Sequence, residues 1–249
     1  MRLDGKIAIV TGGASGFGRG IAELFAEEGA RVIVADLNGA AAADVAQSLG
    51  RGAMAVEADV TKSSDVQQLI ATADEVCGGL DILVNNAGFT HKNQSLMTVG
   101  EAEFDRIYAV NVKSIYLTTL AAVPVMEKRG GGAIINTAST AGVRPRPGLT
   151  WYNGSKGAVI TLTKSMAAEL APRKIRVNAI NPVIGETGML EQFMGMPDTP
   201  ENRAKFLATI PLGRMSTPRD IANAALFLAE PAANFITGVC IEVDGGRCI

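Results

Sequence analysis

Tyr152 and Lys156 lie four residues apart in WYNGSKGAVITL, and Ser139 lies thirteen residues before Tyr152. On a helix, residues i and i+4 share one face, so the Lys156 ammonium can approach the Tyr152 phenol. A free tyrosine has a pKa of about 10, and a neighbouring cation lowers that pKa toward the range useful for acid–base chemistry. Ser139 can hold a substrate oxygen by a hydrogen bond. These residues predict proton transfer at a carbonyl oxygen, although a Tyr–Lys pair alone would also fit an exposed helix surface.

A glycine-rich turn, TGGASGFG, follows the first apolar run of the chain and precedes a helical pattern. Strand, glycine turn and helix start is the order of a dinucleotide site, in which glycines allow close approach of a pyrophosphate and the helix N-terminus favours its charge. The spacing here is G-x-x-x-G-x-G rather than G-x-G-x-x-G. The turn residues expected to contact the cofactor are Gly12, Ser15, Gly16, Phe17 and Gly18.

Acidic residues end the next two strand-like runs. Asp36 ends RVIVAD, where a carboxylate can accept both ribose hydroxyls of adenosine and repel a 2′-phosphate, so NAD is expected rather than NADP. Asp36 could also cap the following helix. Asp59 ends AMAVEAD, placed either to meet the adenine edge or to cap a helix starting near Ser63. Leu37 and Val60, beside these carboxylates, are further expected cofactor contacts.

Asparagines at two places in the chain are also candidates for the site. In an open parallel sheet, ligands lie beyond the carboxyl ends of the strands, which is where DILVNNAG places Asn86, Ala87 and Gly88. Structural support and cofactor contact both remain open for this segment. Asn111 lies inside a predicted helix among apolar neighbours, where a polar side chain needs a partner. It is either a surface asparagine or a helix-bending residue that holds water behind Lys156.

Composition narrows the class of protein. The chain has 249 residues, 47% of them apolar, and a net charge of −2, so nothing indicates nucleic acid or an anionic membrane as a partner. Cys77, Cys240 and Cys248 lack the spacing of metal ligands or of a disulfide framework, so no metal is expected. The segment MRLDGKIAIV does not resemble a signal peptide, and no apolar stretch approaches the ~20 residues of a membrane span. A cytoplasmic protein is expected.

Seven strand-like runs recur with helical segments between them: IAIV, RVIVAD, AMAVEAD, DILVNNAG, GAIINTAS, RVNAIN and GVCIEVDGG. This alternation predicts one α/β domain over residues 1–249, with a Rossmann-type, doubly wound parallel sheet and helices on both faces. Substrate specificity is expected from loops 89–97, 140–150 and 185–212 at the carboxyl edge. The last of these is rich in Met and Phe, and reads either as a lid over an apolar substrate or as plain packing of two short helices.

Basic residues occur in the first two of these loops. His91 and Lys92 lie in FTHKNQS, and Arg144 and Arg146 lie in GVRPRPGLTW close to Tyr152. Two arginines separated by a proline could hold an anionic group by bidentate hydrogen bonds. They could equally be surface charges or contacts between subunits.

Together these motifs identify the chain as a member of the short-chain dehydrogenase/reductase family. TGGASGFG, NNAG, Asn111, Ser139, Tyr152-x-x-x-Lys156 and a final VDGG occur in the family's order and cover essentially the whole chain. The resemblance implies a seven-stranded single domain, usually a homotetramer, and a catalytic tetrad. Tyr152 would be the general acid/base, Lys156 would lower its pKa and bind the nicotinamide ribose, Ser139 would orient the substrate, and Asn111 would hold a relay water.

One segment departs from the family. Where the family usually has Pro-Gly after the sixth strand, this chain has Pro182 and Val183, and valine cannot take the positive φ that glycine allows. The turn is therefore expected to be reshaped, with Gly185 supplying flexibility. Thr187 keeps its place for the nicotinamide carboxamide, so Pro182, Gly185 and Thr187 complete the expected cofactor contacts.

The loops THKNQS, VRPRPGLTWYNGSKGA, NPVIGETGM and GMPDTPENR resemble those of bacterial dehydrogenases that oxidise sulfonated alcohols. The expected function is therefore NAD-dependent interconversion of an anionic alcohol and its carbonyl compound. A 3-oxoacyl-thioester reductase and a neutral secondary-alcohol or sugar dehydrogenase are alternatives. A non-catalytic NAD-binding protein would usually have lost the Tyr or the Lys, and both are present. The helices expected over 103–128 and 151–171 could supply a subunit interface or pack in the core.

Overall fold

Seven strands form one sheet, and the computed structural model describes residues 1–249. The strands are β1 (Ile7–Thr11), β2 (Arg31–Asp36), β3 (Met54–Glu57), β4 (Ile82–Asn85), β5 (Gly132–Thr137), β6 (Ile175–Pro182) and β7 (Cys240–Val243). Their spatial order is β3-β2-β1-β4-β5-β6-β7, and every neighbouring pair is parallel. Each strand falls on one of the seven runs predicted from the sequence. Continuous apolar runs suit these strands because helices bury both faces of the sheet.

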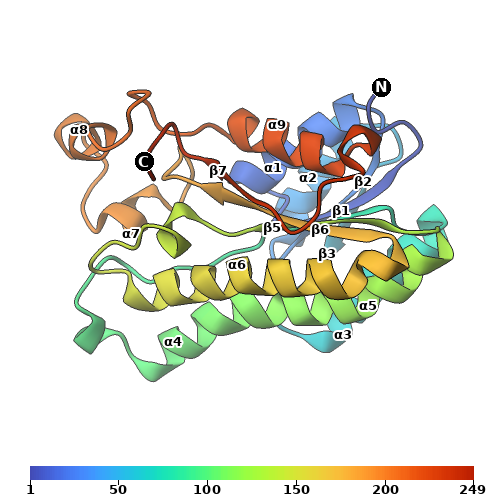
Figure 1. Cartoon of the computed structure of the whole chain (residues 1–249), viewed down its shortest axis with the longest axis horizontal. Coiled ribbons are helices and arrows are strands. Elements are labelled where there is room, and N and C mark those ends of the chain that lie inside the picture. Colours follow the sequence, from blue (N-terminus) through green and yellow to red (C-terminus); the bar gives the residue numbers. More distant parts are fainter.

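Nine α-helices surround the sheet (Figure 1). They are α1 (Gly16–Glu27), α2 (Gly39–Leu49), α3 (Ser63–Ala71), α4 (Glu101–Tyr108), α5 (Ser114–Lys128), α6 (Thr150–Leu170), α7 (Leu190–Met194), α8 (Pro200–Leu207) and α9 (Pro218–Ala229). Helices α1, α2 and α9 pack on one face of the sheet in a core of 24 buried residues. Helices α3, α5 and α6 pack on the other face in a core of 19. This arrangement confirms the predicted doubly wound fold.

The strand order reverses at β1, which pairs with β2 on one side and with β4 on the other. The chain leaves β1 toward one edge of the sheet, and later crosses back to build the other half. A crevice opens at such a reversal, beyond the carboxyl ends of the strands, and ligands of doubly wound sheets bind there. The glycine turn after β1 and the Asn-Asn-Ala-Gly segment after β4 therefore meet at this point.

The helical stretch Glu101–Lys128 departs from the expectation that no apolar stretch of the chain is long enough to span a membrane. By length and composition alone it could cross a membrane, since an 18-residue window in it has a mean hydropathy of 1.3. In the fold it packs against α3, α6 and the sheet, and runs beside α6 in Figure 1. Part of its apolar surface thus belongs to the core, whereas Tyr116 and Leu120 stay exposed. The stretch is not one regular helix, because a π-helical turn, Ala109–Lys113, separates α4 from α5.

The segment between β6 and α9 contains the two short helices predicted for loop 185–212. Leu190 and Met194 of α7 pack with Met215 in a small apolar cluster of their own. Phe206 of α8 lies against the same cluster. This segment therefore packs mainly through contacts among its own side chains, rather than against the two main cores.

Candidate active site

A cavity of about 480 Å³ lies at the carboxyl ends of the central strands, and most of the predicted site residues line it. They are Gly12, Ser15, Gly16, Phe17, Asp36, Leu37, Asp59, Val60, Asn86, Ala87, Gly88, Ser139, Arg144, Arg146, Tyr152, Lys156, Pro182, Gly185 and Thr187. Four predicted site residues do not line the cavity: Gly18, His91, Lys92 and Asn111. Residues that are distant in sequence thus meet in one space large enough for a small-molecule ligand.

The glycine turn after β1 leaves room for a phosphate. Ser15 precedes α1 as its N-cap without a side-chain hydrogen bond to the helix, and the first turn of α1 has no acidic residue. The first backbone N–H groups of α1 are therefore free for a pyrophosphate, which fits a dinucleotide. Gly18 has a packing role instead, because a Cβ there would collide with the Gly12 carbonyl oxygen and the Asn86 side chain.

Asn86 joins the two turns that meet at the strand reversal. Its Nδ2 donates to the carbonyl oxygens of Thr11, at 3.0 Å, and Gly12, at 3.2 Å. The Thr11 hydroxyl in turn accepts from the backbone N–H groups of Asn86 and Ala87. Asn85 is purely internal, since it bonds to Asn136 and Thr118. The NNAG segment therefore fixes the shape of the glycine turn, which bears out the reading as structural support, and it also lines the cavity.

Two carboxylates stand at the far end of the cavity. Asp36 accepts from the backbone N–H groups of Ala14 at 3.1 Å and Asn38 at 3.0 Å. The N-cap of α2 is Asn38, so Asp36 itself does not cap that helix. Asp59 accepts from the backbone and hydroxyl of Thr61, and this bonding lowers the pKa of the Asp59 carboxyl. Both carboxylates are held rigidly by backbone donors and face the cavity.

Asn111 is buried in the π-helical turn and clamps the loop after β4. Its Oδ1 accepts from the Phe89 backbone N–H at 2.8 Å, and its Nδ2 donates to the Phe89 carbonyl at 2.9 Å. The same Nδ2 donates to the Ser155 hydroxyl at 2.9 Å. This excludes the reading as a surface asparagine. The side chain connects the floor of the cavity to helix α6, which carries Tyr152 and Lys156.

Tyr152 and Lys156 are buried on the cavity wall, and burial dominates both pKa values. Burial raises the pKa of Tyr152 to about 12, against smaller lowering effects of the Ser139 hydrogen bond and the Arg146 charge. Burial lowers the pKa of Lys156 to about 8. Lys156 Nζ donates to the Thr137 carbonyl at 2.7 Å and lies 5.8 Å from the centre of the Tyr152 ring. The sequence expectation of a lowered Tyr152 pKa is wrong, because it weighed the cation and not the burial.

Three arginines lie together near Tyr152, since Arg144 donates to the Arg247 carbonyl and the charge of Arg146 acts on both Arg247 and Tyr152. Arg144 and Arg146 line the cavity as predicted, and Arg247 was missed by the sequence reasoning. Arg106, also missed, lines the cavity elsewhere, with its guanidinium 4.1 Å from the centre of the Phe89 ring. None of the four forms an ion pair with a carboxylate. The sequence feature that could have identified Arg247 is its position directly after VDGG, at the carboxyl end of β7.

The segment predicted as a lid covers this arginine-rich end. Met189, Phe193, Phe206 and Thr209 line the cavity. The Phe193 ring packs edge-on against Tyr152, with ring centres 5.2 Å apart. Arg146 reaches the segment twice, donating to the Phe193 carbonyl at 3.3 Å and lying 5.2 Å from the Phe206 ring centre. Arg146 is thus half-buried between the lid segment and Tyr152.

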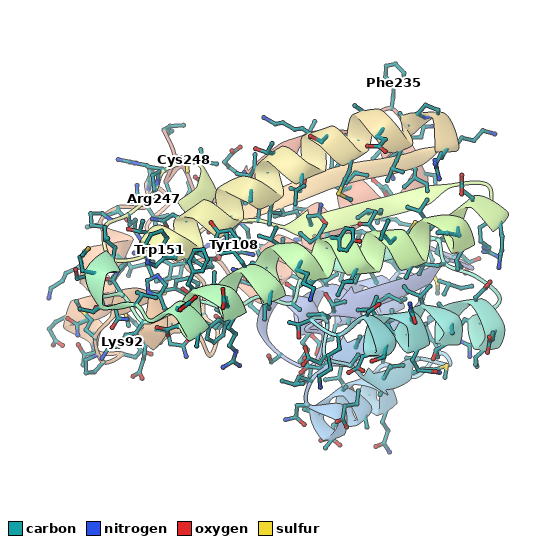
Figure 2. All side chains as sticks on the ribbon, turned by 90° about the horizontal axis from the view of Figure 1, so that it is seen from below. Lys92, Tyr108, Trp151, Phe235, Arg247 and Cys248 are labelled. Carbon is teal, nitrogen blue, oxygen red and sulfur yellow. The ribbon has the colours of Figure 1, made fainter.

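His91 and Lys92 are not placed as predicted. His91 is buried, with Nδ1 bonded to the Lys92 carbonyl and Nε2 without a partner, but it does not line the cavity. Lys92 is exposed, and Figure 2 shows it on the outside of the molecule. Neither side chain therefore contributes charge to the cavity wall.

The turn after β6 is reshaped, as the departure at Val183 predicted. Val183 does not adopt a positive φ, and its backbone N–H donates to the Val243 carbonyl, so this residue extends the contact of β6 with β7. Gly185 does not adopt a positive φ either. A Cβ there would collide with the Phe17 ring and the Ser216 hydroxyl, so close packing requires this glycine, rather than flexibility.

Comparisons with known proteins agree with this geometry. A family profile described as enoyl-(acyl carrier protein) reductase matches residues 12–247. The chain is 52% identical to 4-formylbenzenesulfonate dehydrogenase of Comamonas testosteroni, with 100% of both chains covered. It is 40% identical to 2-(S)-hydroxypropyl-CoM dehydrogenase 3 of Xanthobacter autotrophicus, covering 98% of this chain and 97% of that protein.

A solved structure is similar over the same length. The 3-ketoacyl-(acyl-carrier-protein) reductase from Brucella melitensis complexed with NADH has a TM-score of 0.94 and is 48% identical, covering 99% of this chain and 100% of that chain. The resemblance predicted from the sequence is confirmed, including the likeness to a dehydrogenase of a sulfonated compound. The chain therefore belongs to the short-chain dehydrogenase/reductase family of oxidoreductases.

Proposed function

We propose that this protein interconverts an anionic, sulfonated alcohol and its carbonyl compound, with NAD as the hydride carrier. The observation that carries the proposal is the charge of the cavity beside Tyr152. Arg144, Arg146 and Arg247 line the cavity near Tyr152, and none of the three forms an ion pair with a carboxylate. A sulfonate is a permanent anion whose oxygens accept several hydrogen bonds, so it suits guanidinium donors. The 52% identical relative, named for 4-formylbenzenesulfonate, supports the same substrate class.

The other end of the cavity supports NAD rather than NADP. Asp36 faces the place where the glycine turn would hold an adenosine ribose, and a carboxylate there accepts hydroxyls and repels a 2′-phosphate. No arginine or lysine lines the cavity beside Asp36 to bind such a phosphate, since its neighbour is Leu37. When bound, the nicotinamide accepts the hydride of the alcohol carbon or returns it to the carbonyl carbon.

Tyr152 is proposed to move the hydroxyl proton. In the reductive direction, a phenol with a pKa of about 12 is fully protonated at neutral pH and donates its proton to the carbonyl oxygen. In the oxidative direction, the phenol oxygen must accept the alcohol proton, so its pKa has to fall when the site is filled. The Ser139 hydrogen bond and the Arg146 charge already act in that direction. Ser139 also stands beside the phenol, where it can hold the reacting oxygen.

Lys156 and Asn111 are proposed to support this proton transfer. Because the pKa of Lys156 is lowered to about 8, its ammonium can release and regain a proton near neutral pH. Lys156 Nζ lies near the open space over Gly88, where it can also bind a ribose hydroxyl of the cofactor. The Asn111 side chain has its hydrogen-bond partners in Phe89 and Ser155, and it positions the helix that carries Tyr152 and Lys156. A water behind Lys156 would complete a path for the proton.

A second function has a specific observation in its favour. The Brucella structure and a 40% identical protein of Vibrio harveyi are both named as reductases of 3-oxoacyl or 3-ketoacyl groups on acyl carrier protein. Such a substrate is a long thioester, and the lid segment supplies an apolar cover from Met189, Phe193 and Phe206. The arginines against this cover favour a compact anion over a long acyl chain.

The test is a panel of substrates with both coenzymes. Initial rates of NADH or NADPH formation are measured with sulfonated, neutral aromatic, secondary and sugar alcohols, and rates of oxidation with a 3-oxoacyl thioester. We expect strong turnover of a sulfonated benzyl alcohol with NAD, and little with NADP. Preference for thioester and NADPH would instead assign the second function.

A variant pair tests the role of the arginine charge. Arg146→Ala is expected to raise the KM for the sulfonated alcohol about 10- to 100-fold, the loss of one hydrogen bond to a charged group. Arg146→Lys keeps the charge and should recover part of that loss. An unchanged KM in both Arg144→Ala and Arg146→Ala would exclude the arginine site for the anion.

Residues 185–212 are also proposed to act as a lid that opens and closes over the substrate, because these residues carry a separate small core.

A homotetramer is proposed, with α5 in a subunit interface, because Tyr116 and Leu120 on this helix are 58% and 60% exposed. Light scattering of the wild type and of a Tyr116→Glu, Leu120→Glu variant tests this assembly.

A cytoplasmic location is proposed as well. The three cysteines are unpaired, as expected for a cytoplasmic protein.

A further inference from the structure

Arg247 reaches the cavity from a turn that directly follows β7. Asp244 is buried and accepts twice from this turn, from the Gly246 N–H at 2.9 Å and from the Cys248 N–H at 2.8 Å. These two bonds fix the backbone on both sides of Arg247. The Arg247 side chain lines the cavity, so its guanidinium is presented from a rigid support.

Two other segments of the substrate end hold the same turn. The Leu212 N–H, at the end of the lid segment, donates to the Gly245 carbonyl at 3.0 Å. The Arg144 guanidinium donates to the Arg247 carbonyl. Figure 1 shows this end of the chain beside α7 and α8, and Figure 2 shows Arg247 at the same end of the molecule as Trp151, the neighbour of Tyr152. The turn, the loop of Arg144 and the lid therefore form one wall.

Arg146 and Arg247 both line the cavity at this wall and carry like charges. Neither forms an ion pair, and both are only partly exposed. Burial lowers the pKa of Arg146 most, and the charge of Arg247 lowers it further, which means that the two guanidinium groups repel each other. An anion between them removes that repulsion and gains hydrogen bonds from both.

We propose that Arg247 binds the anionic group of the substrate together with Arg146, and that Arg144 positions Arg247 by holding its backbone. The proposal rests on the proposed function, and assigns a specificity role to a residue outside the family's catalytic motifs. It also divides the two arginines of the RPRP loop between two roles. Arg146 contacts the anion, whereas Arg144 acts through the turn.

The test compares a sulfonated and an uncharged benzyl alcohol with saturating NAD. Arg247→Gln is expected to raise the KM for 4-(hydroxymethyl)benzenesulfonate about 10- to 100-fold, and to change kcat/KM for benzyl alcohol less than about twofold. Arg247→Lys should recover part of the loss. Arg144→Gln should raise the same KM by a smaller factor, because it only loosens the support. Arg51→Gln, at an unpaired arginine outside the cavity, is the matched control and should leave KM and kcat/KM unchanged for both alcohols.

Each other outcome has a definite meaning. Equal losses with both alcohols in Arg247→Gln would show a purely structural role, and no loss with either would show no contact, so both overturn the proposal. A wild type without preference for the sulfonated alcohol would overturn the proposed substrate class.

Calorimetric titration of benzenesulfonate into the NADH-bound wild type and Arg247→Gln then measures anion binding at Arg247 without turnover. Weaker binding by the variant supports the anion site. Equal binding, or no binding by the wild type, overturns it. NADH fluorescence and the melting temperature show whether each variant is folded.

Discussion

The two ends of the cavity differ in charge and in construction. The nucleotide end is built from backbone, glycines and two carboxylates, all supplied by the first four strands and the turns after them. The substrate end is built from long side chains, including Arg144, Arg146 and Arg247, supplied by segments after β4 that lie far apart in the chain. One end is fixed by close packing around Gly18, and the other by side chains that reach across from separate loops.

This difference indicates which end of the cavity tolerates amino-acid substitutions. Close packing at the nucleotide end leaves few substitutions that preserve the turn, so the proposed cofactor would be recognised by a shape common to the fold. At the substrate end, an arginine or a phenylalanine can be replaced without disturbing the sheet. Selectivity for a new alcohol is therefore expected to arise in residues such as Arg146, Phe193 and Arg247.

The largest expected effect lies between the two ends, at Tyr152. Tyr152→Phe should lower kcat by about 10²- to 10⁴-fold, because the proton donor and acceptor is removed and the ring remains. NADH binding, measured by fluorescence titration, should be nearly unchanged. A residual activity above about 1% would exclude the assigned role, since the lower bound of general acid–base catalysis is about 100-fold.

The next largest effect concerns the pH dependence of stability. Lys156 has a folded-state pKa of about 8 against an ordinary value of 10.5, so the unfolded chain binds more protons between these values. The free energy of unfolding should rise with pH in this window, by up to about 3 kcal/mol from this group. Lys156→Met should lack this rise in urea titrations from pH 8 to 10.5. Lys164→Met, at an exposed lysine of the same helix, serves as the control.

A pair of glycine substitutions compares the packing of the two ends directly. Gly18→Ala should destabilise the fold by about 1–3 kcal/mol, because its Cβ would collide with Gly12 and Asn86. Gly188→Ala, in the segment 185–212 that covers the other end, has no atom near its added Cβ and should change stability by less than about 0.5 kcal/mol. Chemical denaturation measures both. Equal losses would mean that the two ends are packed alike.

The smallest expected effect tests the charge of the nucleotide end. Asp36→Asn keeps the size of the side chain and one acceptor oxygen, but removes the negative charge. The ratio of kcat/KM for NAD to that for NADP should fall about tenfold, the order of one charged hydrogen bond. The KM for the alcohol should not change. A constant coenzyme ratio would mean that Asp36 only supports the backbone of Ala14 and Asn38.

Most of the fold could be predicted from the sequence because its signals are local. Each strand is a short apolar run between turn residues, and Asp36, Asp59 and Asn86 follow such runs directly, so their place at one edge follows from the parallel sheet. The interruption at Asn111 was one of the two readings left open, because asparagine is a poor helix residue among apolar neighbours. Its partners, Phe89 and Ser155, were not, because they lie on other segments.

What the sequence could not predict depends on contacts between distant segments. The raised pKa of Tyr152 comes from burial among Ala141, Leu149 and Phe193, which the helix pattern does not reveal. Arg247 joins Arg144 and Arg146 only when the chain has folded. His91 and Lys92 were assigned from their charge alone, and the direction of each side chain depends on a loop without periodic structure.

The π-helical turn at Ala109–Lys113 limits how this enzyme can be re-engineered. It makes the helical stretch Glu101–Lys128 wider there than an α-helix. Deleting one residue would make that stretch more regular, and each α-helical residue turns the helix by about 100°. Thr118 would then turn away from Asn85, to which it now donates at 2.8 Å. A search for stabilising deletions should therefore leave this turn intact, although its local geometry makes it the obvious target.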